Sequence, residues 1–126
     1  MQKTAMTATR AGYPAYRNIL AALDIEPVLI ETEADTRFQP TPKLLDQVEG
    51  RLDGLIVASP SNPTGTVLSY EEMHALCDYC ADRGLRLVSD EIYHGITYGV
   101  PATSALALND DCIVINSFYY NLFRSY

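Results

Sequence analysis

The amino-acid sequence predicts an α/β fold with a mainly parallel sheet and helices packed on it. Short apolar runs alternate along the chain with segments of helical periodicity, which is the pattern of β-α-β units. One run, residues 55–58, is apolar throughout, as in a strand that is buried on both faces. The 126 residues are 48% hydrophobic and 20% charged, which is typical of a chain with a globular core.

The elements before this strand follow from local patterns. Residues 14–23 are predicted to form a helix, because apolar side chains recur there at helical spacing and Pro14 suits a first turn. Residues 27–32 form a short apolar run and are predicted to be a strand. A short helix is expected to begin at Thr41-Pro42 and to stop near Gly50.

The elements after it begin with a loop. Residues 59–65 contain two prolines, an asparagine and a glycine, which predicts a turn rather than a helix or strand. Ser69 then caps a helix, and Glu72 completes a capping box in which each side chain accepts from the other residue's backbone N–H. Gly84 ends this helix.

Two further strands are predicted, at residues 85–89 and 112–117. In parallel sheets, ligands bind beyond the carboxyl ends of the strands. This rule selects three places for a functional site: the loop after Ala58, the turn after Ser89 and the stretch after Asn116.

Charge and composition exclude several classes of function. The 9 basic and 16 acidic residues give a net charge of −7, which repels phosphate backbones, so no nucleic-acid partner is expected. No apolar run approaches the roughly 20 residues of a membrane span, and we expect no secretory signal. A Gly-rich nucleotide-binding loop ending in Gly-Lys-Ser/Thr is also missing. We expect a cytoplasmic protein.

The three cysteines do not indicate a metal or redox site. Cys77 and Cys80 have the Cys-x-x-Cys spacing, but no second pair of ligands follows for zinc. The pair also falls within a helical pattern, not at the strand-to-helix junction of a redox motif. We interpret both as small buried residues of one helix face, and no metal is expected.

The three selected places contain polar residues that each allow a simple structural reading. Asn62 lies between two prolines that would fix its amide, although a tight turn explains it equally. Asp90 follows an apolar strand, where a carboxylate is costly without a cation, although it could cap a turn. Glu91 could pair with a nearby arginine. Ser117 could hold a phosphate oxygen or merely end a strand.

Taken together, the order and spacing of four segments resemble the central part of the class I aminotransferases, which are fold-type I pyridoxal phosphate enzymes. The segments are Tyr13-Pro14-x-Tyr16, Ser59-Pro60-x-Asn62-Pro63-Thr64-Gly65, Ser89-Asp90-Glu91-Ile92-Tyr93 and Asn116-Ser117-Phe118. The resemblance extends from about Gly12 to Phe118, and its second and third segments are highly specific as a pair.

The resemblance implies pyridoxal phosphate as cofactor and gives five residues a role in binding it. Tyr13 would stack on the pyridine ring, and Asn62 and Tyr93 would donate to the phenolic oxygen. Asp90 would pair with the protonated pyridine nitrogen and keep the ring electron-withdrawing. Ser117 would contact the phosphate.

One departure concerns the lysine that forms the Schiff base in this family. The family pattern after the last strand is Ser-Phe-Ser-Lys, whereas this chain has Tyr119 and Tyr120 in place of Ser-Lys. A phenol cannot form an imine, and neither Lys3 nor Lys43 matches the motif. Arg124 does not match the family's phosphate-binding arginine either. No catalytic residue is therefore assigned, and the chain is expected to be inactive alone.

The resemblance therefore predicts residues 1–126 to be an incomplete large, cofactor-binding domain with atypical ends at 1–11 and 119–126. It implies transamination between an amino acid and a 2-oxo acid, with a homodimeric full-length parent. Two alternatives stay open: a carbon–sulfur lyase of the same fold, and a non-catalytic remnant or interaction domain.

Overall fold

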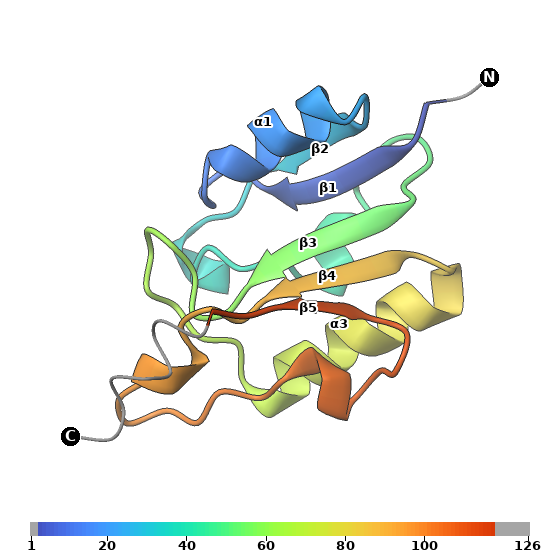
Figure 1. Cartoon of the computed structure of the whole chain (residues 1–126). Coiled ribbons are helices and arrows are strands. Elements are labelled where there is room, and N and C mark those ends of the chain that lie inside the picture. Colours follow the sequence, from blue (N-terminus) through green and yellow to red (C-terminus); the bar gives the residue numbers. More distant parts are fainter. Residues whose placement is uncertain (1–2, 118–126) are drawn as a thin grey trace.

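The computed structural model describes residues 3–117, which form a five-stranded sheet in the order β2-β1-β3-β4-β5 (Figure 1). Every neighbouring pair of strands is parallel, so the predicted α/β class is confirmed. The strands are β1 (Ala5–Thr9), β2 (Glu26–Ile30), β3 (Gly54–Ala58), β4 (Arg86–Asp90) and β5 (Ile113–Ile115).

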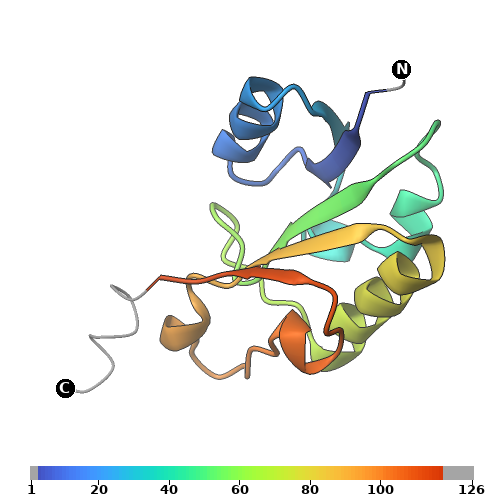
Figure 2. The same cartoon turned by 45° about the vertical axis from the view of Figure 1, so that its right-hand side comes forward.

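The helices cover the two faces of the sheet. Helix α1 lies on one face, and α3 lies on the other (Figure 2). The short α2 packs on the same side as α3. The α-helices are α1 (Ala15–Ala22), α2 (Pro42–Leu45) and α3 (Tyr70–Arg83), and the 3-10 helices are η1 (Ala34–Thr36), η2 (His94–Ile96) and η3 (Ala105–Ala107).

Strand β3 shows why both faces need a cover. Its successive side chains point to opposite faces, because a strand repeats every two residues. Leu55 and Val57 enter the larger core beneath α3, whereas Ile56 packs with Ala8 and Leu20 beneath α1. The continuous apolar run that predicted a doubly buried strand thus serves two separate cores.

Helix α3 begins and ends as predicted. The Ser69 side chain accepts from the Glu72 N–H at 3.2 Å, and the Glu72 carboxylate accepts from the Ser69 N–H at 2.7 Å. Gly84 follows the helix with a φ of 65°, which glycine adopts without strain. Cys77 and Cys80 are buried, free thiols on the inner face. Burial raises the pKa of Cys80 to about 12, so it remains a neutral thiol at physiological pH.

The structure differs from the sequence prediction at several element boundaries. Strand β1, between β2 and β3, was not predicted. Helix α2 ends at Leu45, earlier than the stop expected near Gly50, and β5 has three residues instead of six. Strand β4 extends to Asp90. The expected atypical end at 119–126, with Tyr120, lies outside the described residues.

The carboxyl ends of the parallel strands lie at one edge of the sheet, where residues 10–14, the loop 59–66 and the residues before η2 follow them (Figure 1). This arrangement brings together segments that are far apart in the sequence. Within residues 3–117, no helix has the length and apolar character needed to cross a bilayer.

Candidate active site

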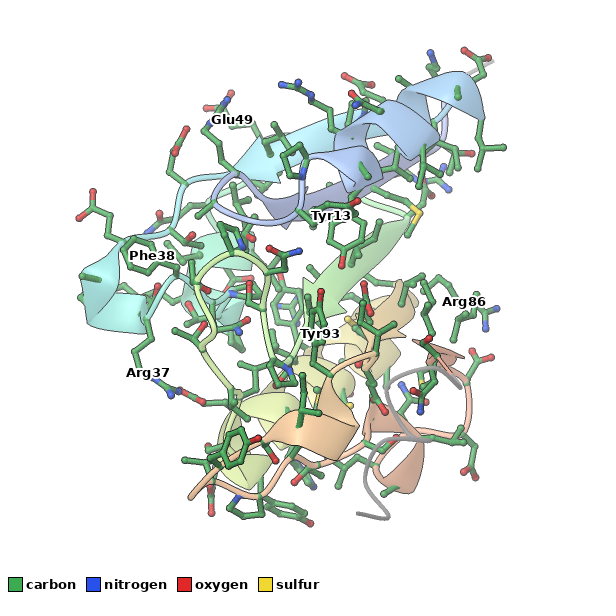
Figure 3. All side chains as sticks on the ribbon, turned by 60° about the vertical axis from the view of Figure 1, so that its left-hand side comes forward. Tyr13, Arg37, Phe38, Glu49, Arg86 and Tyr93 are labelled. Atoms are coloured by element: carbon green, nitrogen blue, oxygen red, sulfur yellow. The ribbon has the colours of Figure 1, made fainter. Side chains whose placement is uncertain are left out.

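A cavity of about 420 Å³ lies at this edge of the sheet. Four of the five predicted site residues line it: Tyr13, Asn62, Asp90 and Tyr93. Tyr13 and Tyr93 face each other across the opening in Figure 3. Ser117 follows β5 and is not among the lining residues. Two of the three places that the carboxyl-end rule selected, the loop after Ala58 and the turn after Ser89, thus border this cavity.

Tyr13 forms the wall of the cavity on the α1 side. It precedes Pro14, the N-cap of α1, which sets the start of the helix as the sequence predicted. The Tyr13 side chain is 47% exposed and meets Tyr16 edge-to-face, with ring centroids 5.7 Å apart and planes at 85°. About half of Tyr13 therefore remains accessible for contact with a flat ligand.

Asp90 brings a carboxylate to the cavity at the end of β4. The residue is only 9% exposed. One carboxylate oxygen accepts from the Tyr16 hydroxyl, and the other accepts from the Ile92 N–H at 3.3 Å. Within residues 3–117, no basic side chain forms an ion pair with Asp90. A buried carboxylate with neutral partners favours the approach of a cation.

Tyr16 is a site residue for which the sequence analysis proposed no role. Burial, followed by the hydrogen bond to Asp90, raises the pKa of Tyr16 well above its ordinary value. The phenol therefore stays protonated and continues to donate to the carboxylate. The available signal was its position three residues after Tyr13, since the turn at the start of α1 brings the two rings into contact.

The loop after β3 carries Asn62 to the cavity. The Ser59 N–H donates to the Asp90 carbonyl at 3.1 Å, which joins the start of the loop to the end of β4. Further along, the Ser61 N–H donates to the Thr66 carbonyl at 2.9 Å and closes the loop. The Ser59–Pro60 and Asn62–Pro63 peptide bonds are both cis. Asn62 is half-buried at the rim.

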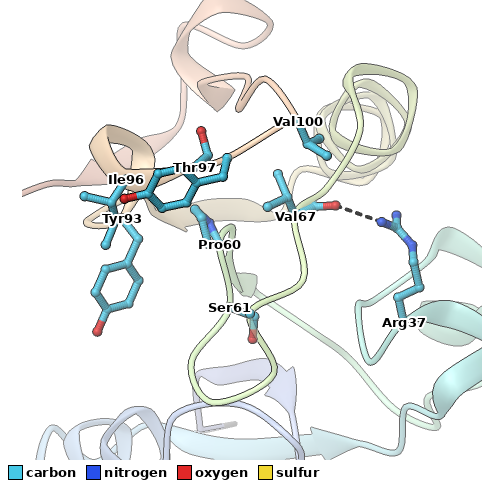
Figure 4. A pocket seen from close by; sticks show the side chains of 10 residues that line it. Arg37, Pro60, Ser61, Val67, Tyr93, Ile96, Thr97 and Val100 are labelled. Carbon is cyan, nitrogen blue, oxygen red and sulfur yellow. Dashed lines mark hydrogen bonds between the residues drawn. The ribbon is translucent and has the colours of Figure 1, made fainter.

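A second cavity, of about 470 Å³, lies beside the first, and Tyr93 and Pro60 border both (Figure 4). Figure 4 shows Tyr93 and Ile96 on one side of it and Arg37 on the other. The Arg37 guanidinium pairs with Glu72 at the start of α3. Tyr93 would thus lie between a ligand in the first cavity and the second cavity.

Glu91 has partners other than the arginine that the sequence left open. The buried carboxylate accepts from the Ser89 hydroxyl at 3.0 Å and from the Ala105 N–H at 2.8 Å. His94 Nδ1 lies 3.5 Å from the other oxygen. These contacts fasten the turn after β4 to η3, and neither Glu91 nor His94 lines the cavity of about 420 Å³.

The residues present fit pyridoxal phosphate. The cavity volume falls within the roughly 300–1,000 Å³ of small-molecule sites. A planar pyridinium ring requires an aromatic wall and a carboxylate for its N–H, and Tyr13 and Asp90 supply both types of group in one cavity. Asn62 and Tyr93 supply an amide and a phenol that can donate to an oxygen on the ring.

A parallel α/β layer with a cavity at its carboxyl edge is the arrangement in which domains of the α/β class bind their ligands. The family model "Aminotransferase class I and II" matches residues 1–118. The chain belongs to this family.

Two known proteins illustrate the range of sequence identity between this chain and its relatives. Valine–pyruvate aminotransferase of Mycobacterium tuberculosis is 50% identical over 113 residues, covering 86% of this chain and 29% of that protein. A 1-aminocyclopropane-1-carboxylate synthase of Cucurbita maxima is 33% identical over 97 residues, 71% of this chain and 20% of that protein.

Solved structures confirm the fold. The crystal structure of an aminotransferase from Mycobacterium tuberculosis superposes with a TM-score of 0.89 at 45% identity, covering 96% of this chain and 32% of that one. Aspartate aminotransferase of Thermus thermophilus with maleate gives 0.86 at 25% identity, covering 94% and 31%. The chain therefore spans about a third or less of the length of these relatives.

Proposed function

We propose that this chain forms the cofactor-holding part of a pyridoxal-phosphate-dependent aminotransferase, which moves an amino group between an amino acid and a 2-oxo acid. The buried Asp90 carboxylate, with its neutral partners, is the observation that carries this proposal. It lies in the same cavity as Tyr13, Asn62 and Tyr93, and this group of side chains matches the demands of one cofactor.

Each residue has a distinct task in this proposal. Asp90 holds the proton on the pyridine nitrogen, and Tyr13 stacks on the ring. Asn62 and Tyr93 donate to the phenolic oxygen, and Ser117 contacts the phosphate. When bound, pyridoxal phosphate supplies the electron sink for the reaction at the substrate's α-carbon.

The substrates that we propose for the complete enzyme are valine and pyruvate. This proposal rests on the 50% identity to valine–pyruvate aminotransferase. We also propose that the complete enzyme is a homodimer, as the family resemblance implies, and that it is a cytoplasmic protein.

The chain with its given sequence is proposed to have negligible transaminase activity. Tyr119 and Tyr120 stand where the family pattern has Ser-Lys, and a phenol supplies neither the covalent link to the cofactor nor the base that moves the proton. Purified chain with pyridoxal phosphate, valine and pyruvate should form no alanine above the protein-free rate. Catalytic formation of alanine by the chain would disprove this proposal.

A titration with pyridoxal phosphate tests the cofactor site directly. The chain should bind the cofactor reversibly, and Asp90→Asn should weaken binding by about tenfold, because the substituted amide cannot compensate the pyridinium charge. Asp78→Asn, at an exposed position on α3, is the matched control and should leave binding unchanged. Equal affinities for the chain and for Asp90→Asn would contradict the assigned role.

A carbon–sulfur lyase is the second candidate within the fold. A relative named as a synthase rather than an aminotransferase shows that members of similar sequence differ in their reaction. Product analysis with a sulfur-containing amino acid separates the two, because a lyase releases a thiol, ammonia and a 2-oxo acid without consuming an added 2-oxo acid.

A non-catalytic role is the third candidate, and Tyr120 at the lysine position favours it. Such a chain would act by associating with an intact homologue. Size-exclusion chromatography with such a homologue tests this role, and separate elution of both proteins would exclude it.

A further inference from the structure

Gln39 is a buried polar residue that the proposed cofactor site does not use. It lies between η1 and α2 and is 3% exposed. Its side-chain nitrogen lies 3.1 Å from three acceptors: the Ala58 carbonyl, the Thr66 carbonyl and the Thr66 hydroxyl. A side-chain amide carries two N–H donors, so these acceptors share them. This is a dense set of contacts for one side chain.

The acceptors lie at the two ends of the loop that carries Asn62. Ala58 is the last residue of β3, and Thr66 is the point at which the loop returns. Within the loop, the Gly65 N–H donates to the Ser61 carbonyl at 2.7 Å. Gln39 therefore links the two ends of the loop by hydrogen bonds. The hydrogen bonds within the loop close the part between these two ends.

The segment before Gln39 fastens the same loop at a second point. Arg37 and Phe38 have φ values of 53° and 60°, a conformation that non-glycine residues rarely adopt and that surrounding contacts must hold. The Arg37 guanidinium donates to the Val67 carbonyl at 3.0 Å, as the dashed line in Figure 4 shows. Residues 37–39 thus contact the chain where it leaves β3, at Ala58, and where the loop ends, at Thr66 and Val67.

We propose that Gln39 is a positioning residue of the cofactor site, which fixes the base of loop 59–66 so that Asn62 is presented to the cavity. This inference rests on the proposed function, since Asn62 has a ligand only if the cofactor binds there. Gln39 itself does not line the cavity of about 420 Å³, so it acts through the loop and not by touching the ligand.

Gln39→Glu is the first test, because it keeps the shape of the side chain but places a carboxylate oxygen against the carbonyls of Ala58 and Thr66. Gln47→Glu makes the same chemical change at an exposed position and is the matched control. Amide hydrogen exchange of the full chain without cofactor reports on the loop through the N–H groups of Ser61 and Gly65, both of which are hydrogen-bonded.

Gln39→Glu should accelerate exchange at these two amides by about fivefold or more, relative to the amides of α3 in the same sample. Gln47→Glu should leave this ratio unchanged. The inference is overturned if exchange in the loop is unaltered, or if the loop and α3 accelerate equally, because the latter would show a general loss of stability. Gln39→Asn shortens the side chain without adding a charge and should also accelerate exchange at the Ser61 and Gly65 amides. This second variant keeps the test valid if Gln39→Glu does not fold.

A double-mutant cycle then tests whether Gln39 acts through Asn62. Gln39→Glu should weaken pyridoxal phosphate binding about fivefold in the unaltered chain, but should cause no further loss when Asn62→Ala is already present. Additive losses would contradict the proposal. If the unaltered chain binds no pyridoxal phosphate, the proposed function fails instead, and hydrogen exchange alone decides whether Gln39 holds the loop.

Discussion

Tyr16 and Asp90 lie 74 positions apart in the sequence, yet they form a hydrogen bond at the floor of the cavity. The Tyr16 hydroxyl donates this hydrogen bond to one oxygen of the carboxylate and so fixes its orientation. A tyrosine suits this position because its raised pKa keeps the phenol protonated as a donor.

The raised pKa of Tyr16 predicts a specific dependence of stability on pH. Above pH 10, the ordinary pKa of tyrosine, the unfolded chain loses a proton that the folded chain retains. The unfolded state then binds fewer protons, so the free energy of unfolding falls as the pH rises. Tyr16→Phe should show a smaller fall than the unaltered chain, as measured by urea unfolding at neutral pH and just above pH 10.

The comparison between the two proteins isolates Tyr16, since the other tyrosines and the buried thiols contribute equally to both. Tyr13→Phe provides a control in the neighbouring ring, which is about half exposed. An identical pH dependence for Tyr16→Phe and the unaltered chain would be incompatible with a protonated, buried Tyr16.

The four lining residues were predicted through the family resemblance, because each belongs to one of its short motifs. The sequence could not predict the Tyr16–Asp90 bond or the contacts of Gln39. These join positions 74, 19 and 27 residues apart, and they depend on how the strands are ordered in space. The sequence could not predict the partner of Glu91 for the same reason, because the Ala105 N–H comes from a later segment.

At the scale of elements, the missed strand β1 shows the limit of apolar periodicity. Residues 5–9 are Ala-Met-Thr-Ala-Thr, which lacks the run of large apolar side chains that marked β3. Thr7 is nevertheless fully buried, because its hydroxyl donates to the Val28 carbonyl of β2 at 2.8 Å. A small polar residue whose hydroxyl is hydrogen-bonded can occupy an interior strand. The composition of residues 5–9, however, does not distinguish this strand from a loop.

Helix α3 was predicted accurately because its signals are local, and its capping box supports a quantitative prediction. Ser69→Ala removes the acceptor for the Glu72 N–H and should lower the free energy of unfolding by about 1 kcal/mol. Ser69→Asp retains an acceptor at the N-cap and should lose much less. Urea unfolding of the three proteins measures both effects, and equal stability of Ser69→Ala and the unaltered chain would show that the box is not stabilising.

For the whole molecule, the edge strand β5 exposes apolar side chains. Ile113 and Ile115 of β5 are 49% and 42% exposed. Within residues 3–117, β5 pairs with β4 but has no strand on its other side. Such an edge promotes association with another chain.

Self-association through this edge is therefore expected at high protein concentration. Ile113→Lys should reduce it, because a lysine on an edge strand opposes pairing. Sedimentation velocity over a range of concentrations measures the effect, with Leu106→Lys, at an exposed position on η3, as the control. If Leu106→Lys reduces association as much as Ile113→Lys does, β5 is not the contact surface.

The central claim is that residues 3–117 build the cofactor site of an aminotransferase, and a chimera tests it most directly. Residues 3–117 would replace the matching segment of Mycobacterium tuberculosis valine–pyruvate aminotransferase, which is 50% identical and supplies the remaining parts of the family pattern. We predict that the chimera transfers the amino group of valine to pyruvate, and that Asp90→Asn within it abolishes the transfer. A folded chimera without activity, or one unaffected by Asp90→Asn, would contradict the account.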